Sequence, residues 1–201
     1  MRLIDLTHPL QSKMPAFKGD QPFMLQKTES GALTSSVITQ SLHVGTHIDA
    51  PMHMIKSSQT MKDFPLSQFT GRAIILDALN QNPITELPGI DGVQAGDIVL
   101  LRTDHSNRFN HPDYYQNYPV ISETLAHQLI KKKIKMIGVD TPSPDKEPYA
   151  IHKALLSHSI CIIENLTQLN KIPFNQPFTL YAFPLALDAE ASPLRVVAEI
   201  T

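Results

Sequence analysis

The chain lacks tryptophan, has a single cysteine and contains no long apolar segment. One cysteine, Cys161, cannot form an intramolecular disulfide, and the apolar residues around it indicate a buried thiol. No segment approaches the roughly 18 uninterrupted apolar residues of a membrane-spanning helix, so no membrane partner is expected. The formal net charge is -2, and no Lys/Arg cluster is interleaved with aromatic residues, so no nucleic-acid partner is expected either.

The composition is instead that of a globular protein, with 42% hydrophobic and 18% charged residues. A chain of 201 residues can form one sizeable core, and we expect a single domain over residues 1–201. The N-terminal segment has no long apolar stretch of the kind found in signal peptides, which predicts a cytoplasmic protein.

Histidine is concentrated in residues 43–53, which hold three histidines and one aspartate. His43, His47, Asp49 and His53 are all separated by even numbers of residues. Residues two apart in an extended chain point to the same face, so these four side chains would share one face, opposite a mainly apolar one. A helix explains the pattern less well, because at about 100° per residue Asp49 would point away from His47. The segment is therefore predicted to be extended, with the histidines and Asp49 on one face and an apolar, core-facing surface on the other.

A straight strand would still keep His43 and His47 about 13 Å apart, too far to share an ion. Gly45 can supply the necessary bend, because glycine tolerates unusual backbone angles. Pro51 can end the strand and direct His53 elsewhere. We predict that the first two histidines and Asp49 converge on a metal ion, which leaves His53 for proton transfer. The alternative is a polar strand face whose histidines only contact water, and it explains a lone histidine better than it explains this spacing.

Apolar periodicity predicts a strand-rich α/β domain. The clearest helix covers residues 122–134, where Ser122 can cap the first turn and three lysines occupy the last. A short helix is expected over residues 149–157. Strands are expected over residues 2–6, 35–44, 72–76, 97–102, 135–139, 159–163, 179–187 and 194–200. Many strands with few helices predict a mixed, strand-heavy sheet.

Two long loops and one carboxylate add to the candidate site. Residues 11–22 form either a lid or a pocket wall, with a surface loop pinned by apolar side chains as an even alternative. Residues 103–120 could supply substrate contacts or form a solvated loop held by tyrosines. Glu164 ends an apolar run, where a carboxylate needs a partner, and a metal ion is one such partner.

Residues 43–53 resemble the complete His-x-Gly-Thr-His-x-Asp-x-Pro-x-His signature of the metal-dependent cyclase/hydrolase family, which includes bacterial kynurenine formamidase. The resemblance extends along nearly the whole chain. His152 and Glu164, twelve residues apart, resemble the family's second pair of metal ligands. Further similar segments are residues 4–7, 100–103, 138–143, 184–187 and 192–195.

This resemblance implies the family's fold, a swivelling β/β/α type of α/β structure, usually assembled as a homodimer or a higher homo-oligomer. It implies that His43, His47 and Asp49 hold one divalent ion. Asp49, His152 and Glu164 would hold a second, and His53 would be the general acid/base.

One departure from the family concerns the substrate. Kynurenine formamidases of this type carry a tryptophan before Pro-Gly-Asp, where the aromatic substrate packs. The similar stretch here is residues 17–20, which begins with Phe17, and the chain has no tryptophan. Phe17 is therefore the candidate substrate-binding residue, and the identity of the substrate stays open.

The expected reaction is hydrolysis of a non-peptide C–N bond in a small molecule, with an aryl formamide similar to N-formylkynurenine as the leading substrate. One or two divalent ions, zinc or manganese, would activate a water molecule. His53 would accept the proton of this water and return it to the leaving amine. The alternatives are a hydrolase or cyclase acting on lactones or cyclic amides, and a non-catalytic metal-binding module. His53 argues against the binding module, because a purely structural metal site needs no free base.

Overall fold

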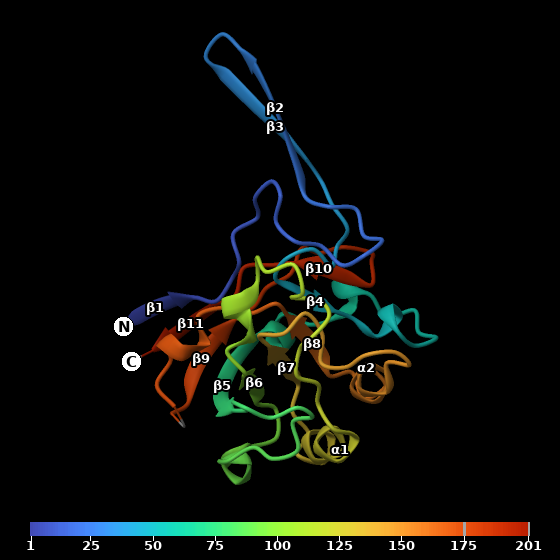
Figure 1. Ribbon diagram of the computed structural model, residues 1–201, viewed down its shortest axis with the longest axis vertical. Helices are drawn as coiled ribbons and strands as arrows, with labels where there is room; N and C mark the ends of the chain where they lie inside the picture. The colour runs from blue at the N-terminus through green and yellow to red at the C-terminus, as the bar shows by residue number, and fades with distance from the viewer. Residues whose placement is uncertain (175, 201) are drawn as a thin grey trace.

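The computed structural model describes residues 1–174 and 176–200, and its body is built on one mixed, curled β-sheet of nine strands (Figure 1). The strand order across the sheet is β1-β11-β9-β5-β6-β7-β8-β4-β10. The strands are β1 (Arg2–Asp5), β4 (His47–Asp49), β5 (Thr70–Asp77), β6 (Ile98–Arg102), β7 (Met136–Val139), β8 (Cys161–Glu164), β9 (Phe178–Tyr181), β10 (Ala191–Pro193) and β11 (Val197–Ile200). Strands β5 to β8 are parallel to one another, and the flanking pairs are antiparallel.

Helices are few. In the described part of the chain the α-helices are α1 (Glu123–Lys131) and α2 (Ala150–Leu156). Short 3-10 helices are η1 (Pro51–His53), η2 (Met61–Asp63), η3 (Leu66–Phe69), η4 (Ile90–Gly92), η5 (His105–Arg108) and η6 (Leu169–Lys171). Ser122 caps α1 as predicted, because its side chain accepts a hydrogen bond from the backbone N–H of Leu125.

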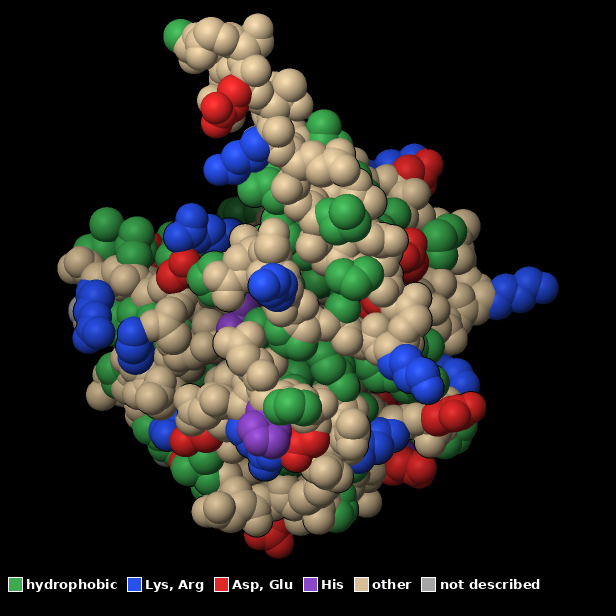
Figure 2. All heavy atoms as spheres, turned by 45° about the horizontal axis from the view of Figure 1, so that its top comes forward, with side chains coloured by type: hydrophobic (Ala, Val, Ile, Leu, Met, Phe, Trp, Pro, Cys, Tyr) green, Lys and Arg blue, Asp and Glu red, His purple; other side chains and the backbone are tan. Residues whose placement is uncertain are grey.

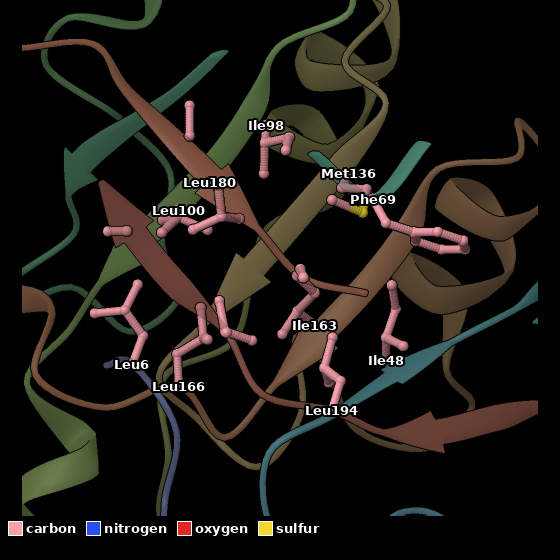
Figure 3. Close-up of a cluster of buried hydrophobic side chains, with 14 of the residues drawn as sticks. Leu6, Ile48, Phe69, Ile98, Leu100, Met136, Ile163, Leu166, Leu180 and Leu194 are labelled. Atoms are coloured by element: carbon pink, nitrogen blue, oxygen red, sulfur yellow. The ribbon is translucent and has the colours of Figure 1, made fainter. Parts of the chain in front are cut away.

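The parallel strands separate two hydrophobic cores. On β5, Ala73 and Ile75 belong to one core, and Ile74 and Leu76 belong to the other. Strand side chains alternate between faces, so a strand buried on both sides is a nearly continuous apolar run. Helices α1 and α2 contribute to the second core, while the curled sheet encloses the first (Figure 3).

The strand-heavy mixed sheet confirms the predicted fold class, but two of the expected strands were too long. The strand expected over residues 35–44 ends at Thr39, and residues 40–46 form a turn before β4. This strand is β3 (Leu33–Thr39), and it pairs with β2 (Met24–Ser30), for which no strand was expected, in a hairpin outside the main sheet. The strand expected over residues 179–187 is β9, which ends at Tyr181.

Within residues 1–174 and 176–200, no helix has both the length and the apolar character needed to cross a bilayer.

Candidate metal centre

The centre is organised by β4, which lies between β8 and β10 and pairs antiparallel with both. Ile48 points into the first core, so His47 and Asp49 share the opposite face. His47 lies directly across from Glu164 of β8, and Asp49 lies across from Ile162. The strand pairing therefore brings together two side chains that are 117 positions apart in the sequence.

The bend predicted at Gly45 is present, since its φ is +75°, in the left-handed region that favours glycine. A Cβ atom here would lie 2.9 Å from Cε of Met14 and 3.1 Å from Cδ2 of Leu10, so the site also has little room for a side chain. The turn brings Nδ1 of His43 to 3.1 Å from Oδ1 of Asp49. The spatial grouping of His43, His47 and Asp49 thus follows from this turn, in place of the expected continuous strand.

His53 ends the 3-10 helix that begins at Pro51, so the proline redirects the chain as expected. The ring centroid of His53 lies 4.2 Å from that of His43 and 5.9 Å from that of His152. A ligand atom of His53 lies within 4.8 Å of ligand atoms of His43 and Asp49. On distance alone, His53 can therefore serve either as a proton-transfer group or as a ligand.

His152 and Glu164 complete the cluster. His152 projects from α2 and places Nε2 3.1 Å from Oε1 of Glu164 and 3.9 Å from Oδ2 of Asp49. The other oxygen of Glu164, Oε2, lies 3.2 Å from Nε2 of His47. All five residues predicted as ligands therefore lie together around the two carboxylates.

Two of the imidazoles are held in a fixed orientation. Nδ1 of His47 donates a hydrogen bond to the carbonyl oxygen of Gly45 at 2.9 Å, and Nδ1 of His152 donates to Oδ1 of Asp145 at 2.5 Å. With Nδ1 held in this way, Nε2 of each ring points into the cluster and is the nitrogen that could bind a metal ion once it has lost its proton. The sequence-based interpretation missed Asp145. A usable signal was its position in a turn-rich loop shortly before His152.

The buried atoms of the cluster fit a metal ion. Among the described residues, Nε2 of His47 and both Asp49 side-chain oxygens are buried and lack a hydrogen-bond partner. Buried polar atoms without partners are costly and rare in native proteins. One group of closely spaced ligand atoms comprises His43, Asp49 and His53, and another comprises His47, Asp49 and Glu164. Asp49 belongs to both groups and could serve both ions. The groups differ from the predicted ligand sets, because His53 takes the place of His47 in the first and His47 takes the place of His152 in the second.

The electrostatics of the cluster favour a cation. Burial alone would lower the pKa of His47, but the carboxylates of Asp49 and Glu164 outweigh it and raise this pKa to about 9. Burial likewise opposes protonation of His152, yet its hydrogen bonds with Asp145 and Glu164 raise its pKa to about 10. Burial would raise the pKa of Asp49, but the charges of His47 and His43 hold it well below its usual range. Without a metal ion, protons on these histidines balance the buried negative charge.

A cavity of about 200 Å³ opens beside the cluster. Its lining includes His53, His152 and Glu164 together with a set of aromatic side chains. The aromatic residues are Phe17, Tyr115, Tyr118 and Tyr149. The two loops expected to line a pocket, residues 11–22 and 103–120, both contribute to this wall. Phe17 is 45% exposed and packs edge-on against Tyr115, with ring centroids 5.7 Å apart.

Comparison with known proteins gives consistent matches. Residues 4–146 match a family model described as "Putative cyclase". The kynurenine formamidase of Bacillus anthracis is 35% identical over 206 residues, which cover 96% of this chain and 95% of that protein.

Solved structures agree over the full length. Isatin hydrolase A from Labrenzia aggregata, solved with benzyl benzoate bound, superposes with a TM-score of 0.89 and 25% identity, covering 100% of this chain and 94% of that one. A predicted metal-dependent hydrolase from Bacillus stearothermophilus superposes with a TM-score of 0.82 and 30% identity, covering 98% and 97% of the two chains.

Proposed function

Because this chain belongs to the cyclase family of metal-dependent hydrolases, we propose that it is a metal-dependent amidohydrolase that cleaves the C–N bond of an aryl formamide. One observation carries the proposal: a buried group of histidines and carboxylates, in which His47 and Asp49 have unpaired atoms, lies beside an aromatic-lined cavity and contributes His53, His152 and Glu164 to its lining. The kynurenine formamidase relatives support the substrate class, since they match over 96% of this chain.

His43, His47 and Asp49 would hold one divalent ion, and Asp49, His152 and Glu164 would hold a second. A divalent ion in this position activates water and polarises the carbonyl group of a substrate. Nitrogen and oxygen ligands suit zinc and manganese. The bridging position of Asp49, within reach of His43, His47 and His152, supports a two-ion site.

His53 would move the proton. Burial lowers the pKa of His53, the charges of His43 and His152 act in the same direction, and together they outweigh the opposing carboxylates of Asp49 and Glu164, which favours the neutral ring. A neutral imidazole can accept the proton of the attacking water at a ring nitrogen and then donate it to the leaving aniline nitrogen. Its place in the cavity wall, between His43 and His152, supports this role.

The aromatic residues of the cavity would bind the substrate ring. Phe17, Tyr115, Tyr118 and Tyr149 offer ring faces and edges to an aryl group. Phe17 takes the region where formamidases of this type have tryptophan, and it offers a smaller surface. We expect it to contribute to substrate binding and to leave the chemical step unaffected.

A ring amide is the second candidate substrate. The specific observation in its favour is the full-length structural match to isatin hydrolase A. The same cluster can open a cyclic amide, because water attack and proton transfer at the carbonyl are common to both reactions.

The test is turnover by the metal-replete enzyme of N-formylkynurenine, isatin and a simple lactone, with His47→Ala as the metal-deficient control and His127→Ala as a control histidine on the exposed side of α1. We expect the formamide to give the highest kcat/KM, the His47 variant to lose metal and activity together, and the His127 variant to keep both. Preferential turnover of isatin would make a cyclic amide the proposed substrate, in place of an aryl formamide. No turnover above a metal-only blank would refute the proposed activity.

We also propose that the protein works as a homo-oligomer, and the exposed hairpin β2–β3 supports this. The cytoplasmic location and the single-domain organisation stay predictions.

A further inference from the structure

The cavity beside the candidate metal centre contains a carboxylate that the proposed reaction does not use. Asp20 is part of its lining, together with Phe17 and Tyr115. Asp20 belongs to neither group of closely spaced ligand atoms, so it stands apart from the residues that could hold the ions. Its charge is therefore available to a bound molecule.

A tight turn fixes Asp20 next to Phe17. The backbone N–H of Asp20 donates a hydrogen bond to the carbonyl oxygen of Phe17 at 3.0 Å. Gly19, between them, has a φ of +102°, which favours glycine. The hydroxyl of Ser41 donates to Oδ1 of Asp20 at 3.2 Å. The aromatic ring and the carboxylate thus belong to one anchored turn.

No basic side chain of the described residues neutralises this carboxylate. The lysine and arginine ion pairs of residues 1–174 and 176–200 all involve other acidic residues. The cavity lining includes no lysine or arginine, and the nearby Lys18 is exposed. Asp20 itself is half-buried, where charges interact more strongly than in bulk water. A cationic group in the cavity would therefore gain from the charge of Asp20.

Two tyrosines of the lining offer their rings to a ligand. The hydroxyl of Tyr115 donates a hydrogen bond to the carbonyl oxygen of Pro15 at 3.3 Å, and that of Tyr118 donates to the carbonyl oxygen of Asp145 at 2.9 Å. Both hydroxyl protons are thus engaged and do not serve an anionic ligand. Aromatic ring faces attract cations. This part of the lining therefore favours positive charge over negative charge.

Tyr115 connects Asp20 with the metal centre. Burial raises the pKa of the Tyr115 hydroxyl, and the charges of Glu164 and Asp20 act in the same direction. Because such an influence weakens with distance, both carboxylates lie near this ring. The cavity has a volume of about 200 Å³. An aryl group placed against Tyr115 can therefore direct one substituent toward the metal centre and another toward Asp20.

The outer surface favours neither sign of charge. The formal net charge is only -2, and the face shown in Figure 2 has basic and acidic side chains interspersed. Attraction of a charged ligand over a long distance requires a large surface region of one sign. Discrimination between charged substrates must therefore arise from the groups that line the cavity.

We propose that Asp20 selects the substrate by charge, and that the enzyme prefers aryl amides whose ring carries a cationic amine. The inference rests on the proposed hydrolysis and narrows its substrate class. The scissile amide lies at the metal centre, the ring lies against Phe17 and Tyr115, and the ammonium group donates a hydrogen bond to Asp20. A substrate with a carboxylate in place of the ammonium group meets like charge there. N-formylkynurenine carries both groups, and this arrangement makes its ammonium group the one that is recognised.

The test compares three formanilides of similar shape and different charge. These are meta-formamidobenzylamine, which is cationic, meta-formamidobenzyl alcohol, which is neutral, and meta-formamidobenzoate, which is anionic. kcat/KM is measured for each with the metal-replete wild type, Asp20→Asn and Asp113→Asn. The amide oxygen of asparagine at position 20 can still accept the hydrogen bond of Ser41, so the turn is kept. Asp113→Asn is the matched control, because Asp113 lies outside the cavity lining.

We expect the wild type and the Asp113 variant to favour the benzylamine over the alcohol by about tenfold in kcat/KM, as a charge-assisted hydrogen bond predicts. In Asp20→Asn this ratio should fall to about one, and the benzoate should gain relative to the alcohol. The wild-type preference should also weaken at high salt. A wild-type ratio near one, or a ratio in Asp20→Asn as high as in Asp113→Asn, would overturn the proposal.

Binding of the amine products separates this inference from the proposed reaction. We expect meta-aminobenzylamine to bind the metal-replete wild type about tenfold more tightly than meta-aminobenzyl alcohol by calorimetry, and Asp20→Asn to lose the difference. That result without any formanilide turnover would refute the hydrolysis and support the selection by Asp20. Turnover of all three formanilides at equal kcat/KM would refute the selection and leave the hydrolysis standing.

Discussion

Replacement of Asp145 by asparagine is expected to weaken metal binding by about a hundredfold while leaving the fold intact. One oxygen of Asp145, Oδ1, accepts the Nδ1–H of His152 at 2.5 Å. The other, Oδ2, accepts the backbone N–H groups of Ile151 at 2.7 Å and of His152 at 3.2 Å. These two N–H groups can bond only to an acceptor, so they hold the oxygen of the asparagine amide on their side.

The NH2 group of the asparagine must then face the ring of His152. It donates a hydrogen bond to Nδ1, so the ring proton moves to Nε2, the atom that lies 3.1 Å from Oε1 of Glu164. A protonated Nε2 cannot bind a metal ion. Loss of the hydrogen-bond partner of a metal-binding histidine lowers metal affinity by about 10–100-fold. Because Asp145→Asn also reverses the tautomer of His152, we expect the larger loss, which corresponds to about 2.7 kcal/mol of binding free energy.

The assay is a metal titration against a competing chelator, combined with urea unfolding of the metal-free protein. The metal-free variant should stay folded, because the asparagine oxygen still accepts the backbone N–H groups of Ile151 and His152. Its free energy of unfolding should fall, because the carboxylate that stabilises protonated His152 is lost. Asp113→Asn is the matched control, since Asp113 also pairs with a histidine Nδ1, that of the exposed His111. Unchanged metal affinity in Asp145→Asn, or an equal loss in Asp113→Asn, would refute the reasoning.

Three further predictions concern the same centre. His53→Ala should keep its metal and its KM but lose about 10²–10⁴-fold in kcat, the usual contribution of a general acid–base; loss of metal would make His53 a ligand, and near wild-type kcat would remove it from the mechanism. Glu164→Gln should bind no more than one ion per chain by elemental analysis under excess metal, because Glu164 lies against both His47 and His152; two ions in this variant would contradict the assignment of Glu164 as a ligand of the second ion. The raised pKa values of His47, about 9, and of His152, about 10, mean that both histidines must lose protons when metal binds, so affinity should increase as pH rises from 7 to 9. The free energy of unfolding of the metal-free protein should fall as pH rises from 6.5 to 10. Below the unfolded-state pKa near 6.5 both states are protonated, and above it the native state holds more protons than the unfolded state. Metal binding that releases almost no protons by calorimetry, or an unfolding free energy that does not change with pH in this range, would contradict the raised pKa values.

The local part of the centre could be predicted from the sequence. The even spacing of His47 and Asp49 places them on one face of β4, and Gly45 and Pro51 mark the turn and the strand end that the structure has. The β5, β6 and β7 strands were also predictable, because burial on both faces requires continuous apolar residues. These features depend on backbone geometry within a few residues.

Strands β2 and β10 could not be predicted in the same way. β2 has the sequence MLQKTES, in which no apolar residue repeats at every second position, and β10 is only three residues long and includes Pro193. Both are strands because of their partners, β3 and β4. Strand formation that depends on a neighbour leaves little signal in the strand itself.

By itself, the sequence determined which residues are chemically capable of holding a metal ion and which local bends they need. The tertiary structure decided which of them meet. The antiparallel pairing of β4 with β8 places His47 opposite Glu164, and the packing of α2 brings His152 to the same carboxylate. The first of these contacts joins residues 117 positions apart, and both are fixed by burial of the two cores and by sheet register, which no short-range pattern encodes. Asp145 shows the same dependence at short range, because only the fold of the loop before α2 turns its carboxylate toward the ring of His152.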